Sequence, residues 1–128
     1  MTKHSLVLLG TVLVLVGMNA GIVSAHASLV SATINSGQVF HVGQTPKMVK
    51  AYFAEPLDPA KSWIAVFENQ ADHGLVTDKQ HSVVNFKNPK EMDLALPKID
   101  KGKYYLMWYT HSAADGHFAA GVRYFRVR

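Results

Sequence analysis

Short runs of alternating apolar and polar residues restrict the fold of this chain more than any other feature. Beyond the first 25 residues helical periodicity is scarce, whereas strand-like runs rich in Val, Tyr, Phe and Trp recur to the C-terminus. In KMVKAYFAEP (47–56), Met48 and Lys50 fall on one face of a strand, and Val49 and Phe53 fall on the other. The further runs are SWIAVFEN (62–69), HSVVNF (81–86), MDLAL (92–96), KYYLMWYT (103–110) and GVRYFRVR (121–128).

Turn-forming residues separate these runs. They are Asn35-Ser36-Gly37, Gln44-Thr45-Pro46, Asp58-Pro59, Asp72-His73-Gly74, Asn88-Pro89 and Lys101-Gly102. Strands at this spacing leave no room for crossover helices. The sequence therefore predicts an all-β fold of about seven strands, a Greek-key β-sandwich or small barrel with an Ig-like arrangement.

The first 25 residues have the layout of a secretory signal peptide. Lys3 and His4 form a basic head, residues 5–17 form an apolar stretch, and small residues lead up to Ala25. The apolar stretch is shorter than the about 20 residues that a membrane-spanning helix needs. We therefore predict a signal peptide over residues 1–25 and one exported domain, not embedded in a membrane, over residues 26–128.

The position of the cut decides the first residue of the exported chain. Cleavage after Val23-Ser24-Ala25 would leave His26 at the N-terminus. A second triplet with small residues at both ends, Ala25-His26-Ala27, would instead place the cut after Ala27 and remove His26. The residues alone leave both cuts open.

Charge and cysteine content exclude two classes of function. The formal net charge is +4, from 13 Lys and Arg against 9 Asp and Glu. The basic residues are scattered rather than gathered into a stripe, so no nucleic-acid interface is predicted. The chain has no cysteine, which excludes both disulfides and thiolate chemistry.

Asp115 and His117 flank Gly116 in the loop that joins the last two predicted strands. In an extended segment, residues two apart project to the same side, so a carboxylate oxygen and an imidazole nitrogen could reach one ion. Asp-Gly is also a common turn pair, and a plain turn is the alternative interpretation.

An N-terminal His26 would supply two more nitrogens, its α-amine and its own ring Nδ1, which close a chelate ring on one metal ion. With the His117 ring and the Asp115 carboxylate, the set becomes three nitrogens and one oxygen. Cu(II) prefers such donors in a flat, tetragonal arrangement. Zinc, which takes a tetrahedral set, remains a competitor, and calcium and magnesium are disfavoured because they prefer oxygen.

Three segments resemble the periplasmic copper-resistance protein C family (CopC). They are HASLVSATINSG (26–37), TPKMVKAYFAEPLDP (45–59) and GKYYLMWYTHSAADGHFAAGVRYFRV (102–127), and they follow one another in the family's order. Residues 62–90 match only in strand rhythm. The resemblance also favours the cut before His26.

The resemblance implies a periplasmic protein of copper resistance and homeostasis that binds Cu(II) through an N-terminal histidine brace. Carried over by position, the metal ligands are His26, Asp115 and His117. Glu55 matches an acidic residue that is a candidate ligand or a hydrogen-bond partner of a ligand. Independently of the resemblance, His111 starts the loop that carries Asp115 and is a candidate to orient a ligand or cap the site. The implied role is a carrier or buffer rather than an enzyme, with the copper ion and an inner-membrane copper transport protein as partners.

Some members of the family bind Cu(I) through a methionine-rich loop. Met48, Met92 and Met107 form no such cluster, and each lies in a strand pattern that predicts core packing. The sequence is therefore identified as a Cu(II)-only member. Two alternatives remain: a small copper-dependent redox enzyme that uses the same brace, and a metal-free interaction sandwich.

Overall fold

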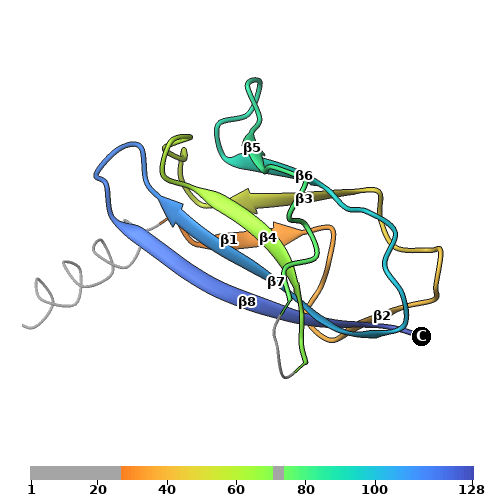
Figure 1. Cartoon of the computed structure of the whole chain (residues 1–128). Coiled ribbons are helices and arrows are strands. Elements are labelled where there is room, and N and C mark those ends of the chain that lie inside the picture. Colours follow the sequence, from red (N-terminus) through yellow and green to blue (C-terminus); the bar gives the residue numbers. More distant parts are fainter. Residues whose placement is uncertain (1–26, 71–73) are drawn as a thin grey trace, which may run out of the picture.

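The chain folds into two four-stranded β-sheets in a computed structural model, which describes residues 27–70 and 74–128 (Figure 1). The strands are β1 (Leu29–Ala32), β2 (Gln38–Phe40), β3 (Met48–Phe53), β4 (Trp63–Glu68), β5 (Val83–Val84), β6 (Glu91–Ala95), β7 (Gly102–His111) and β8 (Phe118–Val127). The first sheet has the order β1-β3-β6-β5 and the second β2-β8-β7-β4. All neighbouring strands are antiparallel except β2 and β8, which are parallel.

The predicted all-β sandwich is confirmed. The structure has eight strands rather than about seven, because the chain before β3 forms two short strands that join different sheets. No helix within the described ranges has the length and apolar character needed to cross a membrane.

The core lies between the two sheets and follows from the alternation seen in the sequence. Val49, Ala51 and Phe53 of β3 face inward, where they are at most 3% exposed. Complete burial of a Val or Phe side chain stabilises the fold by about 1.5–3 kcal/mol. The prediction that the methionines fill the core is right for Met92, which is fully buried, and wrong for Met48, which lies on the polar face of β3 and is 42% exposed.

The two longest strands, β7 and β8, form a hairpin that pairs without interruption from Gly102 opposite Val127 to His111 opposite Phe118. Trp108 lies across Gly121 of the facing strand, and a Cβ atom added at Gly121 would lie 2.4 Å from the indole ring. This hairpin carries the Asp-Gly-His loop at the end of the molecule away from the C-terminus (Figure 1).

Candidate metal centre

The loop between β7 and β8 is a tight, hydrogen-bonded turn. The Ser112 backbone N–H donates to the His117 carbonyl at 2.9 Å, and the Gly116 N–H donates to the Ser112 carbonyl at 2.9 Å. Gly116 has a φ of 75°, in the left-handed region that glycine adopts without a Cβ penalty. The turn interpretation of Asp-Gly is thus correct for the backbone, and it fixes how the two flanking side chains are presented.

This turn brings Asp115 and His117 together, whereas the prediction that their side chains project to one side assumed an extended segment. Asp115 Oδ1 accepts the His117 backbone N–H at 3.0 Å, and Asp115 Oδ2 lies 3.1 Å from His117 Nδ1. The backbone N–H of His117 is the main cause of a lowered pKa at Asp115; burial opposes it and the imidazole adds to it. The His117 side chain is 61% exposed, so the pair combines an ionised carboxylate with an imidazole that faces solvent.

Glu55 reaches this loop through Ser112, a residue that the sequence analysis did not single out. The Ser112 hydroxyl donates to Glu55 Oε2 at 2.6 Å and accepts the Ala114 backbone N–H at 3.2 Å. Ser112 is only 2% exposed, and a buried hydroxyl of this kind keeps its hydrogen-bond partners. Glu55 therefore lies beside the loop and holds its backbone by way of Ser112.

His111 also contacts the loop. Its Nδ1 lies 3.3 Å from the Gly116 carbonyl, which can only accept, so this ring nitrogen is the donor. The ring also packs at the edge of Tyr109, with centroids 5.2 Å apart, and near Phe118, with centroids 6.1 Å apart. These contacts place His111 against the loop backbone.

The described chain begins next to the same loop. The Thr110 hydroxyl donates to the Ala27 carbonyl at 2.7 Å, and both residues are fully buried. On the other side, the Ala54 N–H donates to the Ser28 carbonyl at 2.9 Å. The start of the described chain is thus held between Ala54, which precedes Glu55, and Thr110, which precedes His111.

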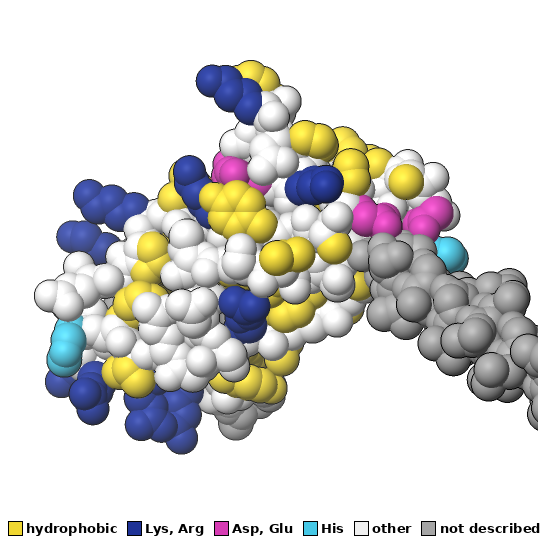
Figure 2. Space-filling view, turned by 180° about the vertical axis from the view of Figure 1, so that it is seen from behind, with side chains coloured by type: hydrophobic (Ala, Val, Ile, Leu, Met, Phe, Trp, Pro, Cys, Tyr) yellow, Lys and Arg dark blue, Asp and Glu magenta, His cyan; other side chains and the backbone are white. Residues whose placement is uncertain are grey.

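Figure 2 shows acidic side chains and a histidine gathered at one end of the molecule. Within residues 27–70 and 74–128, no group of three or more His, Cys, Asp or Glu side chains is placed to hold a metal ion. A centre with three side-chain ligands would therefore need a further residue. His26 and the predicted signal peptide lie outside the described residues.

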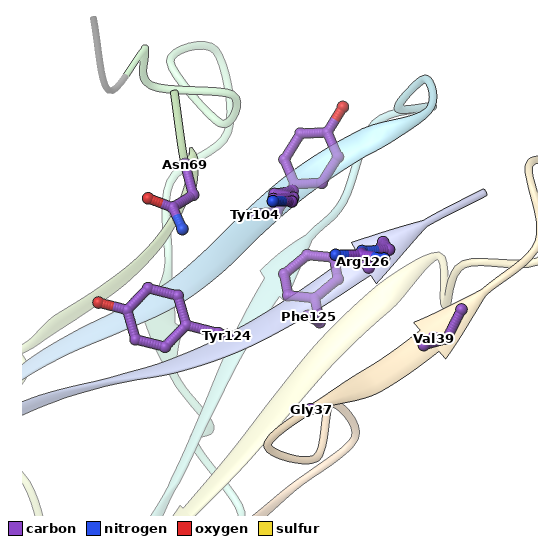
Figure 3. A pocket seen from close by; sticks show the side chains of 8 residues that line it. Gly37, Val39, Asn69, Tyr104, Tyr124, Phe125 and Arg126 are labelled. Carbon is purple, nitrogen blue, oxygen red and sulfur yellow. The ribbon is translucent and has the colours of Figure 1, made fainter. Parts of the chain in front are cut away.

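A hollow of about 300 Å³ lies at the other end of β8 (Figure 3). Tyr124 and Phe125 form much of its wall, and Lys103 and Arg126 are its charged residues. It has no carboxylate or imidazole in its lining, so it is not a second candidate metal centre.

Fold and site together define a small two-sheet β-sandwich that carries a histidine–carboxylate pair on its last hairpin. Residues 29–128 match the model of the CopC domain, and the chain belongs to that family. The resemblance seen in the sequence is confirmed.

Two solved structures illustrate the likeness. The chain is similar to CopC from Methylosinus trichosporium OB3b, with 29% identity and a TM-score of 0.67 over 80% of this chain and 93% of that one. It shares its fold with PcoC, a methionine-rich copper resistance protein from Escherichia coli, with 21% identity and a TM-score of 0.66 over 81% of this chain and 100% of that one. A search of curated proteins found no match.

Proposed function

We propose that this protein binds Cu(II) in the periplasm through an N-terminal histidine brace and acts as a copper carrier or buffer in copper resistance and homeostasis. The proposed ligands are the amine and ring of His26, the ring of His117 and the carboxylate of Asp115. Membership of the CopC family supports copper as the ion. A donor set rich in nitrogen with one carboxylate suits Cu(II), and zinc is the competitor to be tested.

The observation that carries this proposal is the hydrogen bond from Thr110 to the Ala27 carbonyl. Consecutive Cα atoms are about 3.8 Å apart, so the residue before Ala27 is covalently held within one residue of this anchor. The anchor lies at the base of the loop that carries Asp115 and His117. A cut before His26 would therefore release an amine and an imidazole one residue from this anchor.

The positions of the methionines support the Cu(II)-only assignment. Met48 lies on the outer face of the first sheet, Met92 lies in the core, and Met107 pairs with Ala65 and Val122 in the second sheet. Three thioethers placed in this way cannot meet at one soft Cu(I) ion. An enzyme that uses the same brace has less support, because Asp115 would fill a position that oxygen chemistry needs open.

Titration of the exported protein with Cu(II), followed by electron paramagnetic resonance, tests the proposal. We expect one tight equivalent with a tetragonal spectrum and hyperfine structure from nitrogen donors, and intact mass should show a chain that begins at His26. Zinc added in excess should fail to displace the copper, because Cu(II) heads the affinity order. Several weak equivalents of equal affinity would contradict a defined site.

Ser112→Ala is expected to weaken Cu(II) binding by about tenfold to a hundredfold, the usual loss when a residue that orients a metal ligand is removed. The change deletes the donor to Glu55 and the acceptor for the Ala114 N–H. Competition with a chelator of known affinity would measure the loss. Ser82→Ala is the matched control, because it also removes a serine hydroxyl that accepts a backbone N–H, in this case that of Ile64.

Glu55→Gln distinguishes the two roles considered for Glu55. Glutamine keeps an oxygen that can accept the Ser112 hydroxyl, so a residue that acts only through Ser112 should change Cu(II) affinity less than about tenfold. A loss as large as that of Ser112→Ala or larger would mean that the Glu55 carboxylate itself is needed at the metal.

A further inference from the structure

The loop between β5 and β6 projects from the body of the sandwich (Figure 1). Phe86 is 91% exposed, the largest fraction among the large apolar side chains that the structure describes. Figure 2 shows basic and hydrophobic side chains on this projection. At this exposure the Phe86 ring contributes little burial to the fold and is available for contact with a partner.

The backbone of this projection, which we term the Phe86 tip (residues 85–90), is held in a defined shape. Asn85 Oδ1 accepts the backbone N–H groups of Lys87 at 2.9 Å and Asn88 at 3.1 Å. Asn85 Nδ2 donates to Glu91 Oε2 at 3.1 Å and to Asp93 Oδ2 at 3.0 Å. The exposure of Phe86 is thus built into an ordered turn, which lowers the entropy lost on docking.

The charges of the Phe86 tip have one sign. Lys87 and Lys90 are both exposed, and Lys87 Nζ lies 5.7 Å from the centroid of the Phe86 ring. The nearby carboxylates of Glu91 and Asp93 are engaged by Asn85 at the base of the tip. Lys87 therefore lies beside the exposed ring, while Lys90 lies at the base of the tip, where its carbonyl accepts the Phe53 N–H at 2.8 Å.

We propose that the Phe86 tip docks on an anionic phospholipid surface, with the ring entering the boundary of the acyl chains and the two ammonium groups meeting phosphates. A convex tip fits a deformable, extended surface without requiring a matching cavity. Basic residues near a membrane are attracted by anionic headgroups, and Phe is among the side chains that membrane-surface segments bury at the boundary of headgroups and acyl chains. One ring and two cations give weak, reversible contact rather than permanent anchoring.

Co-sedimentation with vesicles tests this inference without any metal. The exported protein should bind vesicles of phosphatidylglycerol and phosphatidylethanolamine at low salt and should not bind vesicles of phosphatidylcholine alone. Phe86→Ala should lower the bound fraction at least about fivefold, because the apolar area of one ring is lost. Lys87→Glu combined with Lys90→Glu should abolish binding, since attraction becomes repulsion.

Tyr124→Ala is the matched control, because Tyr124 is an aromatic residue 52% exposed on the other sheet. It should leave vesicle binding unchanged. None of the variants should alter the Cu(II) spectrum, and the changes at Phe86, Lys87 and Lys90 should not lower the thermal midpoint. The inference is wrong if the unmodified protein does not bind anionic vesicles, which is the result expected of a tip that docks into a protein pocket. Equal binding by Phe86→Ala, or loss in Tyr124→Ala, would also overturn it.

Discussion

One extra residue ahead of His26 is expected to weaken Cu(II) binding by about a thousandfold, equivalent to about 4 kcal/mol. The added residue converts the α-amine into an amide, which removes one nitrogen and opens the chelate ring that the amine and the His26 imidazole would form. The pKa of an α-amine is about 7.7–8.0, so copper displaces its proton at neutral pH. An amide holds its proton far more strongly.

Chelator competition measures this loss, and the same residue added after Arg128 provides the control. The C-terminus lies at the end of the molecule away from the Asp115 loop, so that extension should leave affinity unchanged (Figure 1). Equal affinity in both extended proteins would mean that the amine is not a ligand. A chain that begins at Ser28, from the alternative cut, would also contradict the brace.

His117→Ala is the second large effect that we expect, again about a thousandfold in Cu(II) affinity, since one of three nitrogen ligands is lost. His117 contributes little to folding because its side chain is 61% exposed, so the thermal midpoint of the metal-free protein should change little. The Asp115 carboxylate would keep its contact with the backbone N–H of residue 117 and remain in place. The variant therefore isolates the loss of the imidazole.

His41→Ala is the control for this variant. His41 is an exposed histidine that follows β2, and β2 pairs with the end of β8 farthest from the loop. It should leave affinity and the nitrogen hyperfine pattern unchanged. Similar losses from His41→Ala and His117→Ala would indicate diffuse binding at surface histidines instead of one centre.

Much of the fold could be predicted because the alternation of apolar and polar residues shows which face of a strand is buried. In β3 the inward residues Val49, Ala51 and Phe53 alternate with more polar ones, as the pattern required. The run Trp63–Phe67 gave no such alternation, because its outward residues are apolar as well. Trp63 stacks on Tyr109 and Phe67 stacks on Tyr105, so both faces of this strand contact apolar groups.

The site was only partly open to prediction. Asp115 and His117 are two residues apart, and a local turn brings them together. The role of Ser112 was not predicted because it depends on Glu55, which is 57 positions away in the chain and contacts Ser112 only after the sheets have packed. Serine in a polar loop carries no signal of burial or of a distant carboxylate partner.

The hydrogen bond between Thr110 and Ala27 joins residues that are 83 positions apart in the chain. Contacts of such long range slow folding, because the entropy of closing a long loop is lost before the contact stabilises the chain. Under the proposed function, a nascent or partly translocated chain would still carry its leader on the very amine that copper needs. Metal uptake would then require both proteolysis and complete folding, so only the mature, folded protein would bind copper.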